Sequence, residues 1–574
     1  MPAIGIRLPR KFVLVVIGVV ALTLATARTS DAAQNQTRPT TRAAAMVSHG
    51  GGTGKGGTIR ILEPANFEYL DPAELYSADE ADFGRLFLRT LTIVDDTPGR
   101  KPTIKPDIAR DTGTPSDGDR TWTFRLRHGV TYEDGSPVTS ADIKYAVERT
   151  FASDVLPGVP PYLPVLLANP DHYAGPYKDP NKDLAAVQTP DPYTIVFHFA
   201  APQPDAPWMM SMATAPVPKA KDDGRDYTLH PVASGPYRID SYSPNKSITL
   251  VRNPKWNPAT DPHRPALPDR YEVTFGIDRA TISQRLIADR GEDRNALTLF
   301  DTLQGADIPK LGQPSVKRRV VTGSGHAVLY IVFNELKIKD LQVRKAIALA
   351  INRQAVLTAQ GGPAFGSLTN TIIPEGIAGR NSIDLGLKPT GDPVAAAKAL
   401  NGTPVPTLHF GVSSTSTKQK AIAAQVQSDL KAIGINVVID EIPTDSYSKT
   451  LHNDDKAPDL FVSGFQPDWP TAAAIIPAVL GPDASGTKWV STNLARYYDP
   501  TTSGQIAELA SSSADPAQVG KQFNDLTNQV LSTNWPMLPV VESRNLQVVG
   551  SNIRNAGLST LYSQIDLLRV GVRR

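Results

Sequence analysis

The sequence predicts a mixed α/β protein built from several lobes, and three features support that fold class. The chain has 574 residues, more than a single hydrophobic core accommodates. Short runs in which apolar and polar residues alternate predict strands, as at residues 58–62 and 121–126. Residues 422–439 combine a helical apolar stripe with a following alternating strand, a unit typical of α/β lobes. No heptad repeat points to an oligomer, so we expect a monomer.

Two further helices are predicted from their capping residues and apolar stripes. Thr139 and Asp142 have the spacing of a capping box at the start of one helix. Asp340 is a suitable N-cap for another helix, which we expect to continue until residues 361–363 (GGP) end it. The stripes are Ile143, Val147 and Phe151 in the first helix and Val343, Ile347 and Ile351 in the second.

The N-terminus has the features of an export signal. Three basic residues precede an uncharged apolar run at residues 12–27, which is shorter than the roughly 20 residues that span a bilayer. Small residues near the end of this run offer cleavage sites, so we expect a signal peptide at residues 1–33. The alternative is an uncleaved anchor that holds the same body outside the cell. Residues 34–57 lack apolar periodicity and end in glycines, which predicts a flexible linker.

Charge and composition exclude several classes of function. The formal net charge is +2, and it becomes −1 once the predicted presequence, with four basic residues and one acidic residue, is removed. Such a body has no basic surface for nucleic acid. The chain has no cysteine, which excludes disulfides, thiolate metal sites, cysteine nucleophiles and lipid attachment at a cysteine. The nine histidines are scattered singly, so we expect no metal and no cofactor.

Several segments resemble one protein family. Residues 126–149 (LRHGVTYEDGSPVTSADIKYAVER) closely resemble the signature of the family 5 extracellular solute-binding proteins, the oligopeptide, dipeptide and nickel-binding group. Residues 231–237 (PVASGPY), 250–256 (LVRNPKW) and 334–357 resemble later segments of that family in the same order. The resemblance covers residues 58–574 and implies a periplasmic-binding-protein-like clamshell of type II, with three lobes, mixed sheets and a hinge between lobes I and III.

The same resemblance implies how the lobes follow one another in the chain. Lobe I is assembled from three separate segments, lobe II is inserted into it, and the ligand is enclosed between lobes I and III. The expected segments are 58–95, 216–310 and 541–574 for lobe I, 96–215 for lobe II, and 311–540 for lobe III.

The function implied by the resemblance is non-catalytic capture of a solute. We expect a protein in the extracellular or periplasmic space that binds a peptide or peptide-like ligand and delivers it to an ABC permease in the cytoplasmic membrane. Two alternatives stay open. The first is a protein of the same fold that binds a metal chelate, a glycan or an antibiotic-pathway intermediate, or that acts as a sensor. The second is a secreted hydrolase. The sequence contains neither an HExxH nor a GxSxG motif, so we name no catalytic residue.

Residues 459–470 (DLFVSGFQPDWP) are the best candidate segment for ligand contact. Leu460–Val462 predicts a buried strand that Ser463-Gly464 breaks, so that the following residues leave the sheet edge, where α/β ligand sites lie. In oligopeptide-binding relatives an aspartate at the position of Asp468 meets the α-ammonium group of the ligand, and the resemblance implies that role here. The alternative is that Asp468 caps a helix at residues 471–476 or lies in a turn.

The neighbours of this aspartate complete the candidate site. Gly464 and Gln466 offer backbone groups to an extended peptide, the binding mode in which a ligand adds a strand to a sheet. Many relatives have tryptophan where Phe465 stands and acidic residues where Trp469 stands, so the length and termini of the ligand stay open. Trp469 either supplies a stacking wall or belongs to the core. Weaker candidates, chosen by position alone, are Glu63 and Phe67 after the first strand and Trp489, Asn493 and Tyr497 in an Asn-x-x-x-Tyr loop.

Overall fold

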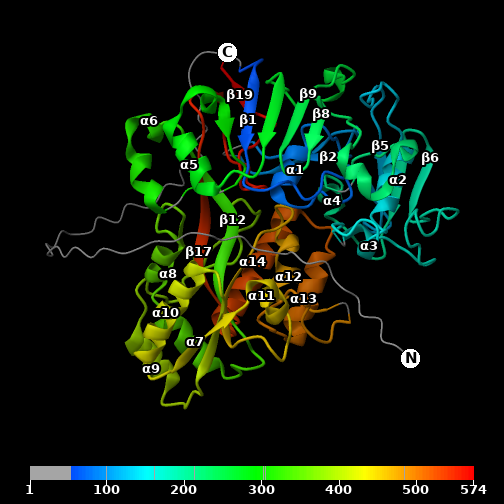
Figure 1. Ribbon diagram of the computed structural model, residues 1–574. Helices are drawn as coiled ribbons and strands as arrows, with labels where there is room; N and C mark the ends of the chain where they lie inside the picture. The colour runs from blue at the N-terminus through cyan, green and yellow to red at the C-terminus, as the bar shows by residue number, and fades with distance from the viewer. Residues whose placement is uncertain are drawn as a thin grey trace, which may run out of the picture.

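The computed structural model describes residues 54–573, apart from residues 98–99, 161, 213, 301–302, 304 and 484. The predicted signal peptide and most of the predicted linker lie outside the described residues. Three larger sheets define three regions of the molecule, which we name the five-stranded, four-stranded and six-stranded regions. Figure 1 shows the five-stranded region above the six-stranded region, with the four-stranded region beside it. No helix in the described part of the chain has the length and apolar character needed to cross a membrane.

The five-stranded region combines the beginning, the middle and the end of the chain. Its strand β1 pairs in parallel with β10 and β11, and the remaining pairs are antiparallel. Ile59 and Ile61 of β1 share one apolar core with Ile553 and Val570 from near the C-terminus, and all four are fully buried. The elements are, in sheet order, β11 (Ala296–Leu297), β1 (Thr58–Leu62), β10 (Arg270–Thr274), β9 (Ser247–Arg252) and β8 (Tyr237–Ser243), with α1 (Ala78–Gly84), α5 (Arg279–Ala288), α6 (Pro314–Lys317), β18 (Ile553–Arg554) and β19 (Gly571–Val572).

The four-stranded region contains the first predicted capping box. The backbone N–H and the hydroxyl of Thr139 both donate to Asp142 Oδ2 at 2.7 Å, so helix α2 begins as expected. The helix ends at Arg149, so the expectation that Phe151 belongs to its stripe is wrong. The elements are β4 (Thr114–Ser116), β5 (Thr121–Arg125), β7 (Thr194–His198) and β6 (Val187–Asp191) in sheet order, with α2 (Ser140–Arg149), α3 (Tyr162–Leu166), α4 (Ala206–Met209) and the hairpin of β2 (Thr92–Asp95) and β3 (Thr103–Pro106).

The six-stranded region is a mixed sheet covered by helices. Strand β14 pairs in parallel with β15 and β16, whereas β12, β13, β16 and β17 form antiparallel pairs. The strands in sheet order are β13 (Gly366–Leu368), β17 (Met537–Val548), β12 (Val320–Phe333), β16 (Leu460–Phe465), β14 (Leu408–Ser413) and β15 (Val437–Ile442). The helices are α7 (Leu341–Ala350), α8 (Arg353–Gln360), α9 (Pro393–Leu400), α10 (Thr417–Lys431), α11 (Thr444–Leu451), α12 (Ile476–Leu480), α13 (Pro500–Ala510) and α14 (Pro516–Thr533).

One helix prediction in this region is only half correct. Asp340 caps α7 as expected, because its Oδ1 accepts from the backbone N–H of Gln342 at 2.7 Å. The helix stops at Ala350 instead of continuing to the glycines at 361–362, because Asn352 accepts from the N–H of Ala355 and starts the new helix α8.

Strands β12 and β17 join the five-stranded and six-stranded regions (Figure 1). Val321 of β12 packs in the five-stranded core, whereas the end of the same strand packs in the six-stranded core. The pairing with β17 shifts register between Ser324 and Val328. At this bulge His326 is fully buried with a positive φ of 48°, and neither ring nitrogen has a hydrogen-bond partner among the described residues. A bulge in two long connecting strands is a suitable place for a hinge.

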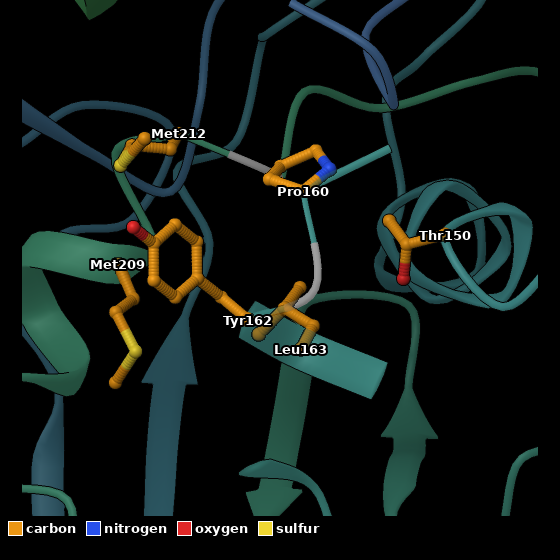
Figure 2. Close-up of a pocket in the computed structure, with 6 residues that line it drawn as sticks. All are labelled: Thr150, Pro160, Tyr162, Leu163, Met209 and Met212. Atoms are coloured by element: carbon orange, nitrogen blue, oxygen red, sulfur yellow. The ribbon is translucent and has the colours of Figure 1, made fainter. Parts of the chain in front are cut away.

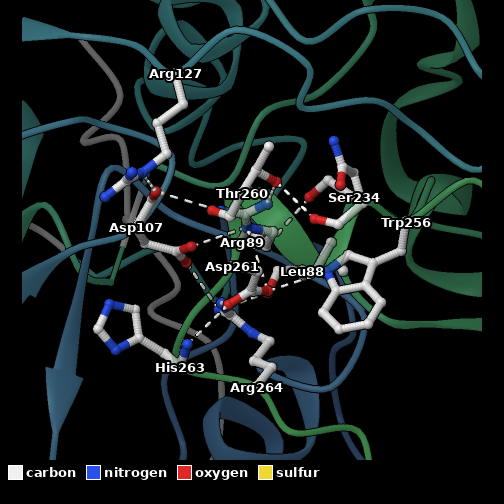
Figure 3. A network of polar contacts seen from close by, with 12 residues as sticks. Leu88, Arg89, Asp107, Arg127, Ser234, Trp256, Thr260, Asp261, His263 and Arg264 are labelled. Carbon is white, nitrogen blue, oxygen red and sulfur yellow. Dashed lines mark hydrogen bonds and ion pairs between the residues drawn. The ribbon is translucent and has the colours of Figure 1, made fainter.

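Buried ion pairs join the five-stranded and four-stranded regions (Figure 3). Asp107 follows β3 and is fully buried, with Oδ1 accepting from Arg89 Nε at 2.8 Å and Oδ2 accepting from Arg264 Nη2 at 2.8 Å. Arg264 also pairs with Asp261 at 3.2 Å. Burial alone would raise the pKa of Asp107, but the charges of Arg264 and Arg89 outweigh burial and lower it. The lobe boundaries given above stay predictions.

Candidate ligand-binding site

The three regions meet at Asp468, in the loop that follows β16. Its Oδ2 accepts a hydrogen bond from the hydroxyl of Tyr162, at the start of α3 in the four-stranded region. Tyr76, just before α1 in the five-stranded region, supplies a second hydrogen bond to the same carboxylate. The carboxylate is therefore held by one side chain from each of the other two regions.

The surroundings of Asp468 disfavour its charged form. Burial raises the pKa of Asp468, and the hydrogen bonds from Tyr162 and Tyr76 only partly oppose that shift. Burial also raises the pKa of both tyrosines, so they remain protonated donors. In the described part of the chain, no lysine, arginine or histidine forms a recorded ion pair with Asp468. A cation brought by a ligand would therefore meet a half-buried carboxylate whose hydrogen-bond partners among the described residues are neutral.

Tyr162 also packs closely against residues of its own region. Figure 2 shows the ring of Tyr162 beside Met209 and Met212, and these residues line a cavity of about 10 Å³, room for about one water molecule. The rings of Tyr76 and Tyr162 lie 6.4 Å apart.

Trp469 is a core residue, but of the opposite region. Its side chain is 8% exposed and lies in the apolar cluster of the four-stranded region. The indole meets the ring of Tyr162 in a T-shaped arrangement at 5.4 Å, and its N–H donates to Asp205 Oδ2 at 2.7 Å. The alternative that Asp468 caps a helix is wrong, because the turn at Ala472–Ala474 has Thr471 at its N-cap position.

Strand β16 runs further than expected. Ser463, Gly464 and Phe465 continue the antiparallel ladder with β12, so the predicted break at Ser463-Gly464 is wrong. On the other side, β14 pairs only with Leu460 and Phe461. Among the described strands, none pairs with the last three residues of β16 on that side.

Gln466 ties the end of β16 to the five-stranded region, because its Nε2 donates to the carbonyl oxygen of Leu561 at 3.0 Å. This contact uses the side chain of Gln466, and the predicted use of its backbone by a ligand stays a prediction.

Glu63 and Phe67 lie inside the five-stranded region. Glu63 is fully buried at the end of β1, its Oε1 accepts from the N–H of Leu299 at 2.8 Å, and burial raises its pKa well above the usual range. Phe67 is 1% exposed and packs against Phe83 and Phe275 with ring centroids 4.9 Å and 5.2 Å away. Their predicted ligand role stays a prediction.

Trp489, Asn493 and Tyr497 lie in the six-stranded region. Asn493 is 1% exposed and donates to the carbonyl oxygens of Gly481 and Tyr497, which holds the loop together. The Tyr497 hydroxyl donates to Thr502 at 3.0 Å. Trp489 and Asn493 line one open hollow of about 430 Å³. No contact of these three residues with Asp468 is recorded in the described part of the chain, so their predicted role also remains open.

A contact of Tyr76, Tyr162 or Asp205 with the candidate segment was not predicted from the sequence. Tyr162 stands between prolines (PPYLP), a pattern that presents an aromatic ring on a short rigid segment, and this was the available signal. Asp205 stands at the N-cap position of α4, so its sequence position suggests a capping role and gives no sign of its contact with Trp469.

Two long paired strands that connect α/β regions, with a half-buried carboxylate where the regions meet, are typical of a clamshell ligand-binding protein. The sequence profile described as "Bacterial extracellular solute-binding proteins, family 5 Middle" matches residues 103–487. The chain belongs to this family, and the predicted family is confirmed.

Individual relatives agree with this assignment. The "Probable D,D-dipeptide-binding periplasmic protein DdpA" of Escherichia coli (strain K12) is 25% identical over 372 residues, which are 62% of this chain and 64% of that protein. A solved structure named "Clavulanic acid biosynthesis oligopeptide binding protein 2" is 30% identical, with a TM-score of 0.82 over 93% of this chain and all of that chain. The complex of Haemophilus influenzae OppA with RPPGFSPFR is 18% identical, covers 90% of this chain and 99% of that chain, and shares the fold with a TM-score of 0.64. The predicted fold class is confirmed.

Proposed function

We propose that this solute-binding protein captures a peptide or peptide-like ligand through the ligand's free ammonium group. The carrying observation is Asp468, a half-buried carboxylate at the meeting point of three regions whose hydrogen-bond partners among the described residues are neutral hydroxyls. Because a buried charge is costly without an opposite charge, an α-ammonium group is the complement that this site favours. The tyrosine hydroxyls then act as additional donors to the same carboxylate.

The free side of β16 supports an extended ligand. Residues 463–465 keep one edge in the ladder with β12, while the pairing with β14 on the other side stops at Phe461. A peptide lying along that side would bond to the main chain as an added strand, with its N-terminus toward Asp468. Such recognition reads the backbone of the ligand and tolerates varied side chains.

The cellular setting follows from the family and from the sequence. We place the protein outside the cytoplasmic membrane, without a lipidated cysteine because the chain contains none, and we propose that it delivers its ligand to an ABC permease as a non-catalytic monomer. It has no role in nucleic-acid binding.

A second candidate is transport of an antibiotic-pathway intermediate. The observation that favours it is the 30% identity, over the full length of that chain, to the oligopeptide-binding protein named for clavulanic acid biosynthesis. The two candidates differ in the ligand and share the site.

Mass spectrometry of ligand extracted from purified protein, followed by calorimetric titration with trialanine and N-acetyl-trialanine, tests the proposal. We expect a co-purified peptide or amine-bearing solute and binding of the free peptide only. Equal affinity for the acetylated form contradicts the ammonium assignment at Asp468. A non-peptide solute in the extract, together with no heat from either peptide, favours the second candidate.

A further inference from the structure

The loop after β16 places one side chain deep in another region. Trp469 belongs by sequence to the six-stranded region, yet its indole is buried in the apolar cluster of the four-stranded region, edge to face with Tyr162. Separation of the two regions would expose this ring to water, which opposes opening.

Asp205 receives the polar end of the same contact. Its Oδ2 accepts from the indole N–H of Trp469 and from the hydroxyl of Thr471, both at 2.7 Å. Asp205 stands at the N-cap position of α4, but its side chain makes no capping hydrogen bond. Burial raises the pKa of Asp205, while the donors from Thr471 and Trp469 oppose that shift. The recorded hydrogen bonds of this carboxylate in the described chain therefore serve the contact with the opposite region.

The contact lies directly beside the proposed ligand carboxylate. Asp468 and Trp469 are consecutive and share Tyr162, whose hydroxyl donates to Asp468 and whose ring meets the indole of Trp469. Asp468 also accepts from Tyr76, and the indole N–H of Trp469 donates to Asp205. Movement of this short segment makes or breaks both sets of contacts together.

We propose that Trp469, Thr471 and Asp205 form a latch between the six-stranded and four-stranded regions that holds the closed form and positions Asp468. The role of the latch, which is to slow the release of a bound ligand, rests on the proposed function. Its contacts form without a ligand. All three are positioning residues, because their recorded partners are residues of the chain itself.

The test uses the full chain without ligand. Because the protein has no cysteine, Asn181→Cys in the four-stranded region and Lys456→Cys in the six-stranded region, both exposed, accept a donor and an acceptor dye. Single-molecule energy transfer then measures the ratio of closed to open molecules. Trp469→Phe, which keeps a ring but removes the N–H, should lower this ratio about five- to tenfold, the size expected for one lost hydrogen bond. Asp205→Ala removes the bonds from both Trp469 and Thr471 and should lower the ratio at least as much.

A matched control separates the latch from general damage. Trp256→Phe removes the same kind of bond, from an indole N–H to the carboxylate of Asp261 at 3.1 Å, within the five-stranded region, and should leave the ratio unchanged. The double variant Trp469→Phe with Asp205→Ala should lower the ratio by less than the product of the two single effects, because both substitutions remove the same hydrogen bond between Trp469 and Asp205.

Three outcomes overturn the latch: an open wild-type protein, unchanged ratios in both single variants, or an equal shift in the Trp256→Phe control. These outcomes leave the peptide proposal standing, because that proposal is tested by titration. If no peptide binds, the peptide proposal fails, but the ratio of closed to open molecules still tests the latch.

Discussion

Two junctions of this molecule hold their carboxylates in opposite ways: Asp107 is fully buried, whereas Asp468 and Asp205 are half-buried. Between the five-stranded and four-stranded regions, Asp107 is paired with two guanidinium groups and its pKa is lowered. Between the six-stranded and four-stranded regions, Asp468 and Asp205 accept only from hydroxyl and indole donors, and their pKa values are raised.

The difference indicates which junction can open. Separation of Asp107 from Arg89 and Arg264 would break ion pairs that hold a fully buried charge, so that junction is built to stay closed. Hydroxyl and indole donors are neutral and are easily replaced by water, so their separation from Asp468 and Asp205 leaves no unpaired cation behind. We infer that the first junction is permanent and the second is the moving one.

The largest expected effect comes from breaking the permanent junction. Asp107→Ala should lower the free energy of unfolding by about 3 to 5 kcal/mol, because Arg89 and Arg264 lose their shared partner in the interior. The midpoint of urea unfolding measures this loss. Asp205→Ala, the same change at the other junction, should cost clearly less, and equal losses would contradict the comparison.

The next effect concerns binding. Asp468→Asn should weaken binding of a free peptide by about 2 to 5 kcal/mol in calorimetric titration, because the ligand ammonium loses its counter-charge. Asp459→Asn is the matched control, since Asp459 flanks the other end of β16, where it accepts from the N–H of His409. A similar loss of affinity in both variants would show damage to the strand instead of a lost contact.

The ligand-free stability of the same variant gives a second measurement. A carboxyl whose pKa is raised by folding lowers stability once the pH exceeds its unfolded value, because the folded state holds the proton more tightly. Asp468→Asn removes that penalty, so its unfolding midpoint at neutral pH should equal or exceed that of the wild type.

The hinge between the regions should respond to acid. Burial lowers the pKa of His326 to about 4, and the backbone of Glu375 only partly opposes this shift. Neither ring nitrogen has a hydrogen-bond partner of normal geometry among the described residues. A histidine with a lowered folded pKa loses stability as the pH falls from about 6.5 to about 4, because only the unfolded chain then takes up the proton. The loss amounts to about 3 kcal/mol at most.

Urea unfolding at several pH values compares the wild type with His326→Asn, since asparagine tolerates the positive φ. The variant should lose this part of the pH dependence, whereas His409→Asn on the surface should keep it. An unchanged pH slope in His326→Asn would rule out the buried imidazole as the cause.

The smallest effect is expected from one tyrosine hydroxyl. Tyr162→Phe should weaken peptide binding by about 0.5 to 1.5 kcal/mol, because Tyr76 still donates to Asp468. Loss of this donor raises the pKa of Asp468, so affinity should begin to fall at a higher pH during acidification. Affinity measured from pH 4 to 8 tests the shift, and an acid limb at the wild-type position would contradict the proposed contact.

The fold was predictable because its signals are local. The capping box of Thr139 and Asp142 and the cap at Asp340 act over three residues, so sequence spacing reveals them. The end of α7 was missed because Asn352 starts a new helix inside an apparently continuous stripe. The extent of β16 was missed because its ladder with β12 stabilises a glycine that looks like a break.

The site was predictable only in part. Asp468 was found from its position in the family pattern, but its partner Tyr162 lies 306 residues away in the chain. Trp469 and Asp205 are 264 residues apart, and no local pattern connects them. Contacts between regions depend on how the regions dock, which single-sequence periodicity does not encode.

The bulged pair of β12 and β17 restricts the kind of motion available to the molecule. Two strands that share a long ladder cannot slide past each other, because a shift of one residue would turn every side chain to the opposite face. They can bend where the ladder is interrupted, at Ser324 to Val328. We therefore expect opening and closing to be a bend at this bulge, in which the two long strands move together.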